Sequence, residues 1–215
     1  PVVLLTDGFI ANSSEAWRIP NMADMPTITA PEPAECSGDF KPYARDERFV
    51  RCWAEAGRTG CQHRIGGLEK NALTGNISYD PANHAVMVAT RAAKVSAVAN
   101  DIPQQSILGD REGDLLVVGW GGTYGHLRAA MEELRAMGQK VAMAHFKYIN
   151  PLPKNTEEVL TKYPKVVVAE QNMGQLAAWL RMKVDNFVPY QYNEVKGQPF
   201  TVSTLVDNFM EIIKK

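Results

Sequence analysis

Beyond residue 105, short apolar runs alternate with longer amphipathic stretches, and this alternation constrains the fold more than any other feature of the chain. Each apolar run suits a strand buried on both faces, and each amphipathic stretch has a helical period. Strands are predicted at 114–119, 140–145, 165–170 and 188–193, and helices at about 124–137, 155–163, 174–186 and 201–213. Because strands that alternate with helices of this length pair in parallel through crossovers, residues 106–215 are predicted to form a compact three-layer α/β domain.

The first 105 residues do not show this regular alternation. The opening "VVLLT" at 2–6 is interpreted as a buried strand, followed by a turn and a short helix entered through residues 12–14. A buried strand needs neighbours on both sides, so the chain is expected to be a fragment of a longer protein whose sheet lies largely upstream. Residues 20–80 are rich in proline and lack periodicity, which favours an ordered linker lying over its own domain or, alternatively, a loop that contacts ligand.

A helix is expected after the "DP" at 80–81, with one apolar stripe formed by Val88, Ala92, Val95 and Ala99. Composition excludes some classes of partner. The formal net charge of −1 gives no field that would favour nucleic acid or an anionic membrane surface. No apolar run reaches the roughly 18 to 20 residues that span a bilayer, and no signal peptide is recognisable.

The three cysteines, Cys36, Cys52 and Cys61, are an odd number at wide spacings. This pattern predicts free thiols in a reducing cytoplasm rather than a disulfide framework. Their separations of 16 and 9 residues also differ from the short spacings with which one loop presents several thiolates to an iron–sulfur cluster.

A glycine-rich stretch, "VVGWGGTYG" at 117–125, lies between a predicted strand and a predicted helix. It misses the dinucleotide fingerprint by one position, and the next strand ends in His145 and Phe146 rather than in an acid for the ribose. We interpret it as a packing turn in which Gly121 and Gly122 form the turn and Gly125 lets the helix approach. An anion at the helix start remains the alternative.

Two polar loops follow predicted strands, at the sheet edge where ligands and partners gather in α/β proteins. One is "HFKYINPLPKN" at 145–155. The other, "AEQNMGQLAAWL" at 169–180, places Glu170, Asn172 and Gln175 around Gly174. Both an interface or ligand contact and simple helix capping are compatible with these residues.

Six segments together resemble one family. They are "LLTDGFIANSSEAWRIP", "HRIGGLEK…TGNISYDPANH", "DLLVVGWGGTYG", "YINPLPKNTEEVL", "VVAEQNMGQL" and "KGQPF". In this order they resemble the C-terminal portion of the α subunit of 2-oxoacid:ferredoxin oxidoreductases, most closely of the 2-oxoglutarate type. The family reaction is oxidative decarboxylation of a 2-oxoacid with coenzyme A to acyl-CoA, CO2 and reduced ferredoxin.

The resemblance also implies a domain organisation. Residues 1–19 would end a domain that binds the pyrimidine half of thiamine diphosphate, residues 20–105 would form a linker plus helix, and residues 106–215 would be a transketolase C-terminal-like domain with a largely parallel sheet. Thiamine diphosphate, Mg²⁺ and an iron–sulfur cluster are expected in the holoenzyme, with the partner β subunit or upstream residues. This segment is then expected to bind no cofactor alone, to hold no catalytic or metal-binding residue, and to be inactive by itself.

The segment would therefore act mainly as scaffold and subunit interface in a cytoplasmic hetero-oligomer that uses ferredoxin and coenzyme A. Arg64 is the candidate contact for substrate or coenzyme A, the alternative being an internal salt bridge with Glu69 or Asp80. The candidates for the subunit interface or ligand face are Tyr148, Asn150, Pro151, Pro153, Glu170, Asn172 and Gln175. Two other interpretations stay open: a stand-alone nucleotide-binding or regulatory module, and another thiamine-dependent 2-oxoacid enzyme.

Overall fold

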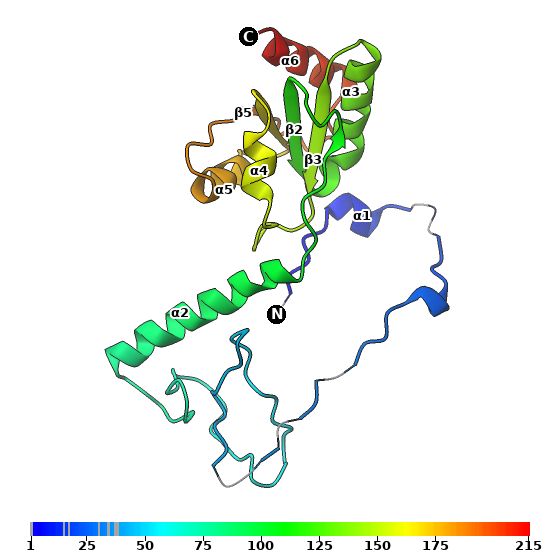
Figure 1. Ribbon diagram of the computed structural model, residues 1–215. Helices are drawn as coiled ribbons and strands as arrows, with labels where there is room; N and C mark the ends of the chain where they lie inside the picture. The colour runs from blue at the N-terminus through cyan, green and yellow to red at the C-terminus, as the bar shows by residue number, and fades with distance from the viewer. Residues whose placement is uncertain (1, 15, 17, 30, 34, 37–38) are drawn as a thin grey trace. The chain divides into compact units, whose positions relative to one another are not determined.

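The computed structural model describes residues 2–14, 16, 18–29, 31–33, 35–36 and 39–215. The chain divides into two compact units. One consists of Pro1–Glu15 together with Ile102–Lys215, and the other of Ala16–Asp101. The first unit contains the β-sheet, and the second contains the longest helix (Figure 1).

The sheet of the first unit has five strands in the order β1-β3-β2-β4-β5. The strands are β1 (Leu108–Gly109), β2 (Leu115–Trp120), β3 (Val141–Phe146), β4 (Val166–Glu170) and β5 (Tyr190–Asn193). Strands β2 to β5 pair in parallel, whereas β1 runs antiparallel to β3. The four predicted strands are therefore present, and the short edge strand β1 was not predicted.

Helices cover both faces of this sheet (Figure 1). Helices α3 (Tyr124–Ala136) and α6 (Val202–Lys214) pack on one face, with alternate residues of the buried strands beneath them. Helices α4 (Thr156–Thr161) and α5 (Gln175–Lys183) pack on the other face, over the intervening strand residues. Each central strand thus contributes to two separate cores, which confirms the three-layer α/β fold with a mainly parallel sheet.

The first residues do not form the expected strand. Residues 2–7 have no regular secondary structure, and Val2 and Val3 are 98% and 82% exposed. A strand requires a neighbour that accepts and donates its backbone hydrogen bonds, and no described strand pairs with this segment. The short helix α1 (Gly8–Asn12) lies earlier than expected, because it begins directly after Asp7 and ends where the predicted helix was to start.

In the second unit, the predicted helix after residue 80 is α2 (Pro81–Ala97). It is followed directly by the short 3₁₀ helix η2 (Val98–Asn100), and another short 3₁₀ helix, η1 (Met22–Asp24), lies near the start of the unit. The predicted apolar stripe is wrong, because Val88 and Val95 are 47% and 46% exposed. The buried residues of α2 are instead Asn83 and Met87. A polar side chain occupies the buried position since the Asn83 amide accepts a hydrogen bond from the Ala72 N–H and donates one to the Lys70 carbonyl.

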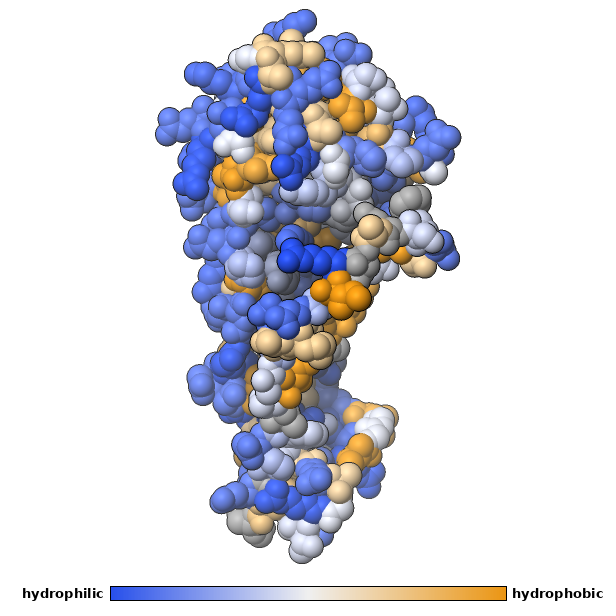
Figure 2. All heavy atoms as spheres, turned by 90° about the vertical axis from the view of Figure 1, so that its right-hand side faces the viewer, coloured by the Kyte–Doolittle hydropathy of each residue, from blue (hydrophilic) through white to orange (hydrophobic). Residues whose placement is uncertain are grey.

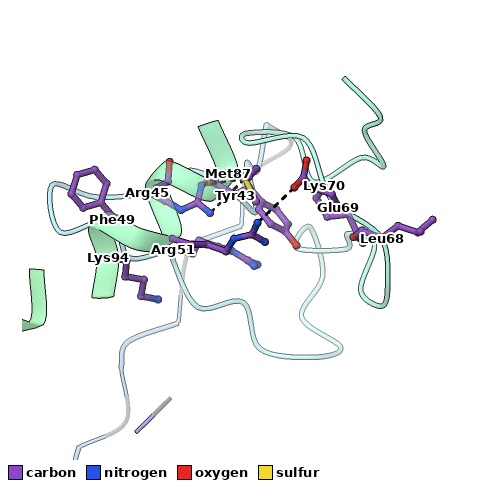
Figure 3. A pocket seen from close by; sticks show the side chains of 11 residues that line it. Tyr43, Arg45, Phe49, Arg51, Leu68, Glu69, Lys70, Met87 and Lys94 are labelled. Atoms are coloured by element: carbon purple, nitrogen blue, oxygen red, sulfur yellow. Dashed lines mark hydrogen bonds and ion pairs between the residues drawn. The ribbon is translucent and has the colours of Figure 1, made fainter. Parts of the chain in front are cut away.

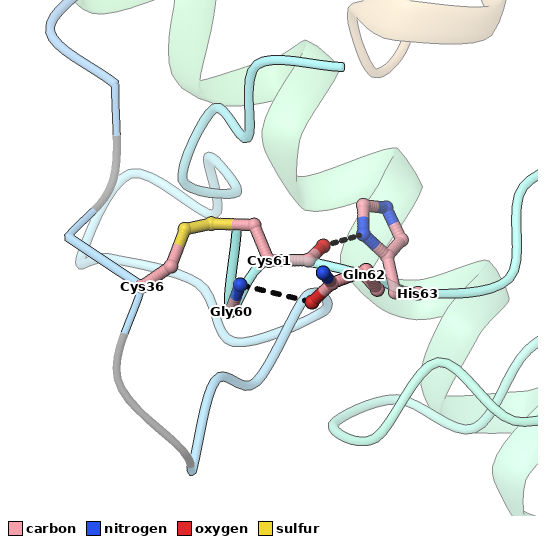
Figure 4. The surroundings of a disulfide bond; sticks show 5 residues. All are labelled: Cys36, Gly60, Cys61, Gln62 and His63. Carbon is pink, nitrogen blue, oxygen red and sulfur yellow. Dashed lines mark hydrogen bonds between the residues drawn. A yellow bond between two sulfur atoms is a disulfide. The ribbon is translucent and has the colours of Figure 1, made fainter. Parts of the chain in front are cut away.

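Cys36 and Cys61 form a disulfide in this unit, whereas Cys52 is free and exposed (Figure 4). The prediction of three free thiols is therefore wrong. The two Cα atoms are 5.0 Å apart across 25 residues of sequence, and spacing alone does not reveal such a long-range approach. Gly60 has φ +85°, and a Cβ there would lie 2.9 Å from the Cys36 carbonyl oxygen, so the close approach requires glycine.

Thiol mapping should show this pairing directly. We expect alkylation of the denatured, unreduced full-length protein, followed by peptide mass spectrometry, to label Cys52 and leave Cys36 and Cys61 joined. The same experiment after reduction is the control, and should label all three. Full labelling of Cys36 and Cys61 before reduction, in protein that was acid-quenched from cells, would contradict the disulfide.

The surface carries scattered hydrophobic side chains. On the face drawn in Figure 2, hydrophilic residues predominate and hydrophobic ones lie in small groups between them. None of the helices that the structure describes is both long enough and apolar enough to cross a bilayer.

Candidate functional site

The carboxyl ends of β2, β3 and β4 bring together side chains from three sequence regions. Trp120 ends β2, His145 lies one residue before the end of β3, and Glu170 ends β4. In a parallel sheet these ends share one edge, and loops at this edge carry ligand or partner contacts in many α/β proteins. The geometry at this edge separates groups that are already used within the fold from groups that are free to contact another molecule.

Glu170 is fully buried, and its carboxylate is satisfied by four donors. Its oxygens accept hydrogen bonds from the Trp120 indole N–H (3.1 Å), the Asn172 amide (3.0 Å) and the backbone N–H groups of Leu176 (2.8 Å) and Ala177 (2.9 Å). The last two belong to the first turn of α5, where free N–H groups and the helix dipole favour a negative charge. The expectation that Glu170 is an exposed contact is therefore wrong: it holds α5 against β2 and β4.

Asn172 shapes the turn between β4 and α5. Its side-chain oxygen accepts the N–H groups of Gly174 (2.7 Å) and Gln175 (3.1 Å), while its amide reaches Glu170. Gly174 has φ +93°, and a Cβ there would meet the Gln191 side chain at 2.6 Å. Asn172 is half-buried, whereas the Gln175 side chain is exposed at the edge. Of the three polar candidates in this loop, Gln175 is the one presented to solvent.

The loop after β3 is anchored at one point and open at others. The Trp179 indole donates to the Ile149 carbonyl at 2.8 Å, which fixes the loop to α5. Tyr148 is 42% exposed and Asn150 is also exposed, whereas Pro151, which follows a cis peptide bond, is half-buried and Pro153 is buried. Tyr148 and Asn150 therefore offer side chains for contact, and the two prolines shape the loop.

His145 packs between this loop and the start of α3. Its ring meets Tyr124 edge-on with centroids 5.2 Å apart, and its Nε2 atom is buried with no hydrogen-bond partner among the described residues. Burial lowers the pKa of His145 below its ordinary value of 6.5, and Lys147 lowers it further, while hydrogen bonding to the backbone of Gly121 and Trp120 opposes the change. His145 is thus held in its neutral form within the fold.

The lowered pKa makes stability depend on pH in a defined direction. Folding disfavours protonated His145, so its contribution to stability is complete above the ordinary pKa of 6.5 and is lost as the pH falls below that value through the lower pKa of the folded state. We expect the wild type to lose more free energy of unfolding than His145→Gln as the pH falls from about 7.5 to 5, in urea titrations at constant ionic strength. Parallel curves for the two proteins would contradict this coupling.

The glycine-rich turn after β2 is a packing feature. Residues Gly121–Thr123 form a 3₁₀ turn, η3, and Gly121 has φ +60°. The close approach between β2 and α3 occurs at Gly119, where a Cβ would lie 2.2 Å from the Leu127 Cδ1 atom, and a Cβ on Gly125 would meet nothing within 4 Å. The role given to Gly125 is therefore wrong and belongs to Gly119.

The same turn offers poor surroundings for an anion. A Cβ built on Gly122 would lie 3.1 Å from a carboxylate oxygen of Asp7, so a negative charge already faces the start of α3. At the start of α5 the corresponding position is filled by the Glu170 carboxylate. Both helix starts at this edge thus have a carboxylate of the chain itself nearby, which disfavours the anion-binding alternative.

Arg64 lies in the second unit and is exposed. The proposed internal partner Glu69 instead pairs with His84 (2.8 Å) and Arg91 (3.7 Å), and none of the ion pairs among the described residues includes Arg64. Its guanidinium is therefore available to a ligand. No group of three or more histidine, cysteine or acidic side chains suited to a metal ion occurs among the described residues.

Comparison with known proteins finds relatives that share one function. Residues 113–205, most of the sheet-containing unit, match the family model "Pyruvate:ferredoxin oxidoreductase core domain II". The whole chain is 49% identical to the 2-oxoglutarate oxidoreductase subunit KorA of Mycobacterium tuberculosis. It is 28% identical to subunit alpha of 2-oxoacid:ferredoxin oxidoreductase 1 of Aeropyrum pernix. The chain spans about a third of the length of these relatives, 32% and 34%.

A solved structure agrees with both the fold and the family. The 2-oxoglutarate:ferredoxin oxidoreductase of Magnetococcus marinus, solved with 2-oxoglutarate, coenzyme A and succinyl-CoA bound, matches 90% of this chain with a TM-score of 0.82 and 31% identity. The match covers 34% of the chain in that structure. The chain described here is thus similar, over its whole length, to about a third of the length of the α subunits of 2-oxoacid:ferredoxin oxidoreductases.

Proposed function

We propose that the chain is the C-terminal part of the α subunit of a 2-oxoglutarate:ferredoxin oxidoreductase. The whole enzyme would decarboxylate a 2-oxoacid oxidatively with coenzyme A, yielding acyl-CoA, CO2 and reduced ferredoxin. The 49% identity to a 2-oxoglutarate oxidoreductase subunit over the entire chain is the observation that carries this proposal. The Magnetococcus enzyme, which binds 2-oxoglutarate, coenzyme A and succinyl-CoA, supports the choice of substrate.

Within that enzyme the segment acts as scaffold and subunit interface. The buried carboxylate of Glu170 accepts hydrogen bonds from within the chain, which suits a structural role. Exposed Tyr148, Asn150 and Gln175 form the contact face toward the β subunit, with Asn172, Pro151 and Pro153 shaping its loops. Residues 1–19 belong to the preceding pyrimidine-binding-type domain, residues 20–105 to the linker with its helix, and residues 106–215 to the transketolase C-terminal-like domain.

The described residues do not fit the enzyme's redox cofactors. Two of the three cysteines are joined to each other, the third is exposed, and no cluster of metal-binding side chains is present in the described parts of the chain. The cysteines described here do not suit an iron–sulfur cluster, and the proposal assigns the cluster, thiamine diphosphate and Mg²⁺ to the β subunit and to other parts of the α subunit. Arg64, exposed and unpaired among the described residues, is the proposed contact for coenzyme A or the 2-oxoacid carboxylate.

We place the enzyme in the cytoplasm, because coenzyme A and ferredoxin are supplied there. The reaction and the substrate are tested together with the full-length α subunit co-produced with its β subunit. We expect coenzyme A-dependent reduction of a viologen dye, fastest with 2-oxoglutarate among several 2-oxoacids. Another preferred 2-oxoacid would contradict the substrate, and no dye reduction with any of them would contradict the reaction.

The interface is tested by introducing charges at two of its exposed side chains. We expect Tyr148→Glu combined with Gln175→Arg to weaken α–β association at least about tenfold, because charges would be buried without partners. The matched control is Glu112→Arg, an exposed charge reversal in the loop before β2, at the opposite ends of the strands. Co-purification and analytical ultracentrifugation measure the effect, and an intact complex in the double variant would refute this face as the interface.

A further inference from the structure

A tight loop in the second unit places two arginines side by side. Arg45 and Arg51 form an antiparallel β-bridge, so their side chains leave the backbone on the same side. The loop between them is held by the Asp46 carboxylate, which accepts the N–H groups of Arg48 (2.9 Å) and Val50 (2.8 Å). Like charges directly opposite each other destabilise a strand pair, so this arrangement needs compensation from elsewhere.

The surroundings of the two arginines supply only weak or neutral acceptors. The Arg45 guanidinium reaches the Tyr43 carbonyl at 3.4 Å and the Met87 sulfur at 3.8 and 3.9 Å. Arg51 donates from Nε to the Pro42 carbonyl at 2.8 Å, and its guanidinium carbon lies 3.8 Å from the centre of the Tyr43 ring. These contacts orient the guanidinium groups, and most of their N–H donors, including those of the Nη groups of Arg51, have no acceptor among the described residues.

Both arginines line a cavity of about 280 Å³ that five cationic side chains and a single carboxylate surround (Figure 3). One of the cations, Lys70, is already satisfied. It is 2% exposed, and its ammonium donates to three carbonyls in the turn before it, those of Gly66 (2.8 Å), Gly67 and Leu68 (2.7 Å). Because an ammonium has three donors, Lys70 shapes the wall and leaves the other cations to face the cavity.

The one carboxylate does not balance them. Glu69 is shared between His84 at 2.8 Å and Arg91 at 3.7 Å. Lys94, one turn along α2 from Arg91, is exposed and has no ion-pair partner among the described residues. Burial lowers the pKa of Arg45, and Arg51 and Arg91 lower it further by repulsion while Tyr43 opposes them. The cavity thus holds excess positive charge under mutual repulsion.

We propose that this cavity binds a phosphoryl group, held by the guanidinium forks of Arg45 and Arg51 with Arg91 and Lys94 at its edge. A tetrahedral dianion matches the planar, forked donors of arginine and compensates several cations at once. The cavity is slightly smaller than the sites that enclose drug-sized molecules. It therefore suits a phosphate, free or at the end of a larger molecule that extends into solvent. This assignment does not depend on the proposed enzymatic activity.

Titration calorimetry on the full-length protein with its copurifying subunits, in phosphate-free buffer of low ionic strength, tests the site with inorganic phosphate. We expect saturable binding that Arg51→Gln weakens about tenfold or more, by removal of a charged fork. Lys94→Gln should weaken it about threefold, since an exposed cation contributes less. The matched control is Arg58→Gln, an exposed arginine of the same unit outside the cavity, which should bind like the wild type.

Two further ligands, coenzyme A and dephospho-coenzyme A, distinguish a free phosphate from a phosphate at the end of a larger molecule. Coenzyme A carries a 3′-phosphate that dephospho-coenzyme A lacks. Tighter binding of coenzyme A than of both dephospho-coenzyme A and inorganic phosphate, lost in Arg51→Gln, assigns the site to a terminal phosphate of a larger ligand. If only the binding of inorganic phosphate is weakened in Arg51→Gln, the site is assigned to the free ion. Either result supports a phosphoryl site, whether or not dye reduction is observed.

The proposal is overturned if neither phosphate nor coenzyme A binds with an affinity that depends on Arg51 and Lys94. Arg51 also holds the Pro42 backbone, so circular dichroism and thermal melting must first show that Arg51→Gln folds. If it does not fold, Lys94→Gln decides the question, because its side chain is exposed and its removal leaves the cavity wall intact. Unchanged phosphate binding in folded Lys94→Gln would then refute the site, and binding of an acidic peptide in place of phosphate would also do so.

Discussion

Replacing Glu170 by alanine is expected to lower the free energy of unfolding by about 4 kcal/mol, as measured by urea denaturation. The substitution leaves two buried helix N–H groups without their acceptor, and it also removes the acceptor of an indole N–H and a side-chain amide on half-buried residues. Each unsatisfied buried donor costs about 1–3 kcal/mol, and relaxation recovers part of the sum. The start of α5 should also become less protected in amide hydrogen exchange.

A graded series identifies the hydrogen bonds as the cause. Glu170→Gln keeps one oxygen, which can serve the three donors that share Oε2, but its amide nitrogen then faces the Ala177 N–H. We expect this variant to lose about half as much stability as Glu170→Ala. Glu133→Ala, an exposed glutamate of α3, is the control and should change stability by less than about 0.5 kcal/mol. Equal effects of Glu133→Ala and Glu170→Ala would contradict the account.

Glu170 illustrates what the sequence predicted at the candidate site and what it did not. Polar residues at the end of a buried strand marked the right edge of the sheet. Three of the four donors to this carboxylate are local, but the fourth, the Trp120 indole N–H, lies fifty residues earlier in the chain. Long-range pairing of this kind leaves no local pattern, so the sequence located the edge correctly and placed Glu170 on its surface incorrectly.

The sequence predicted the fold correctly where the spacing of apolar residues reflects the local helix or strand. The strands β2 to β4 and helices α3 to α6 are buried on predictable faces of one layered unit, whereas the edge strand β5 is largely exposed. The stretch at 2–6 has the composition of a strand but lacks a described neighbour to pair with. The stripe on α2 failed because Asn83, a polar residue, is the buried one.

The second unit was the least predictable part. Its organisation depends on the Cys36–Cys61 disulfide, on the carbonyls gathered around Lys70 and on the bridge between Arg45 and Arg51. None of these has a periodic signature, and prolines obscure the local pattern. The density of arginines in "YARDERFVR" at 43–51 was the one visible signal for the cationic cavity.

A pair of glycine substitutions on either side of the turn after β2, one in β2 and one in α3, should have effects of opposite sign. Gly119→Ala places a Cβ 2.2 Å from the Leu127 Cδ1 atom and 2.8 Å from the Thr123 hydroxyl oxygen. Leu127 is fully buried between β2 and α3, so its side chain has no free space into which it can turn. Overpacking of a tight core costs about 1–3 kcal/mol, and we expect a loss near the upper end of that range in urea denaturation.

Gly125→Ala is the matched partner, six residues further along the chain. Its Cβ would meet nothing within 4 Å, and Gly125 lies within α3, where alanine is favoured over glycine. We therefore expect stability to rise by about 0.5 kcal/mol, because alanine restricts the unfolded chain and suits the helix. If the motif were a dinucleotide cradle, Gly125→Ala would instead abolish a calorimetric signal for NAD that the wild type gives. A neutral Gly119→Ala together with a destabilising Gly125→Ala would reverse the assignment of the close approach.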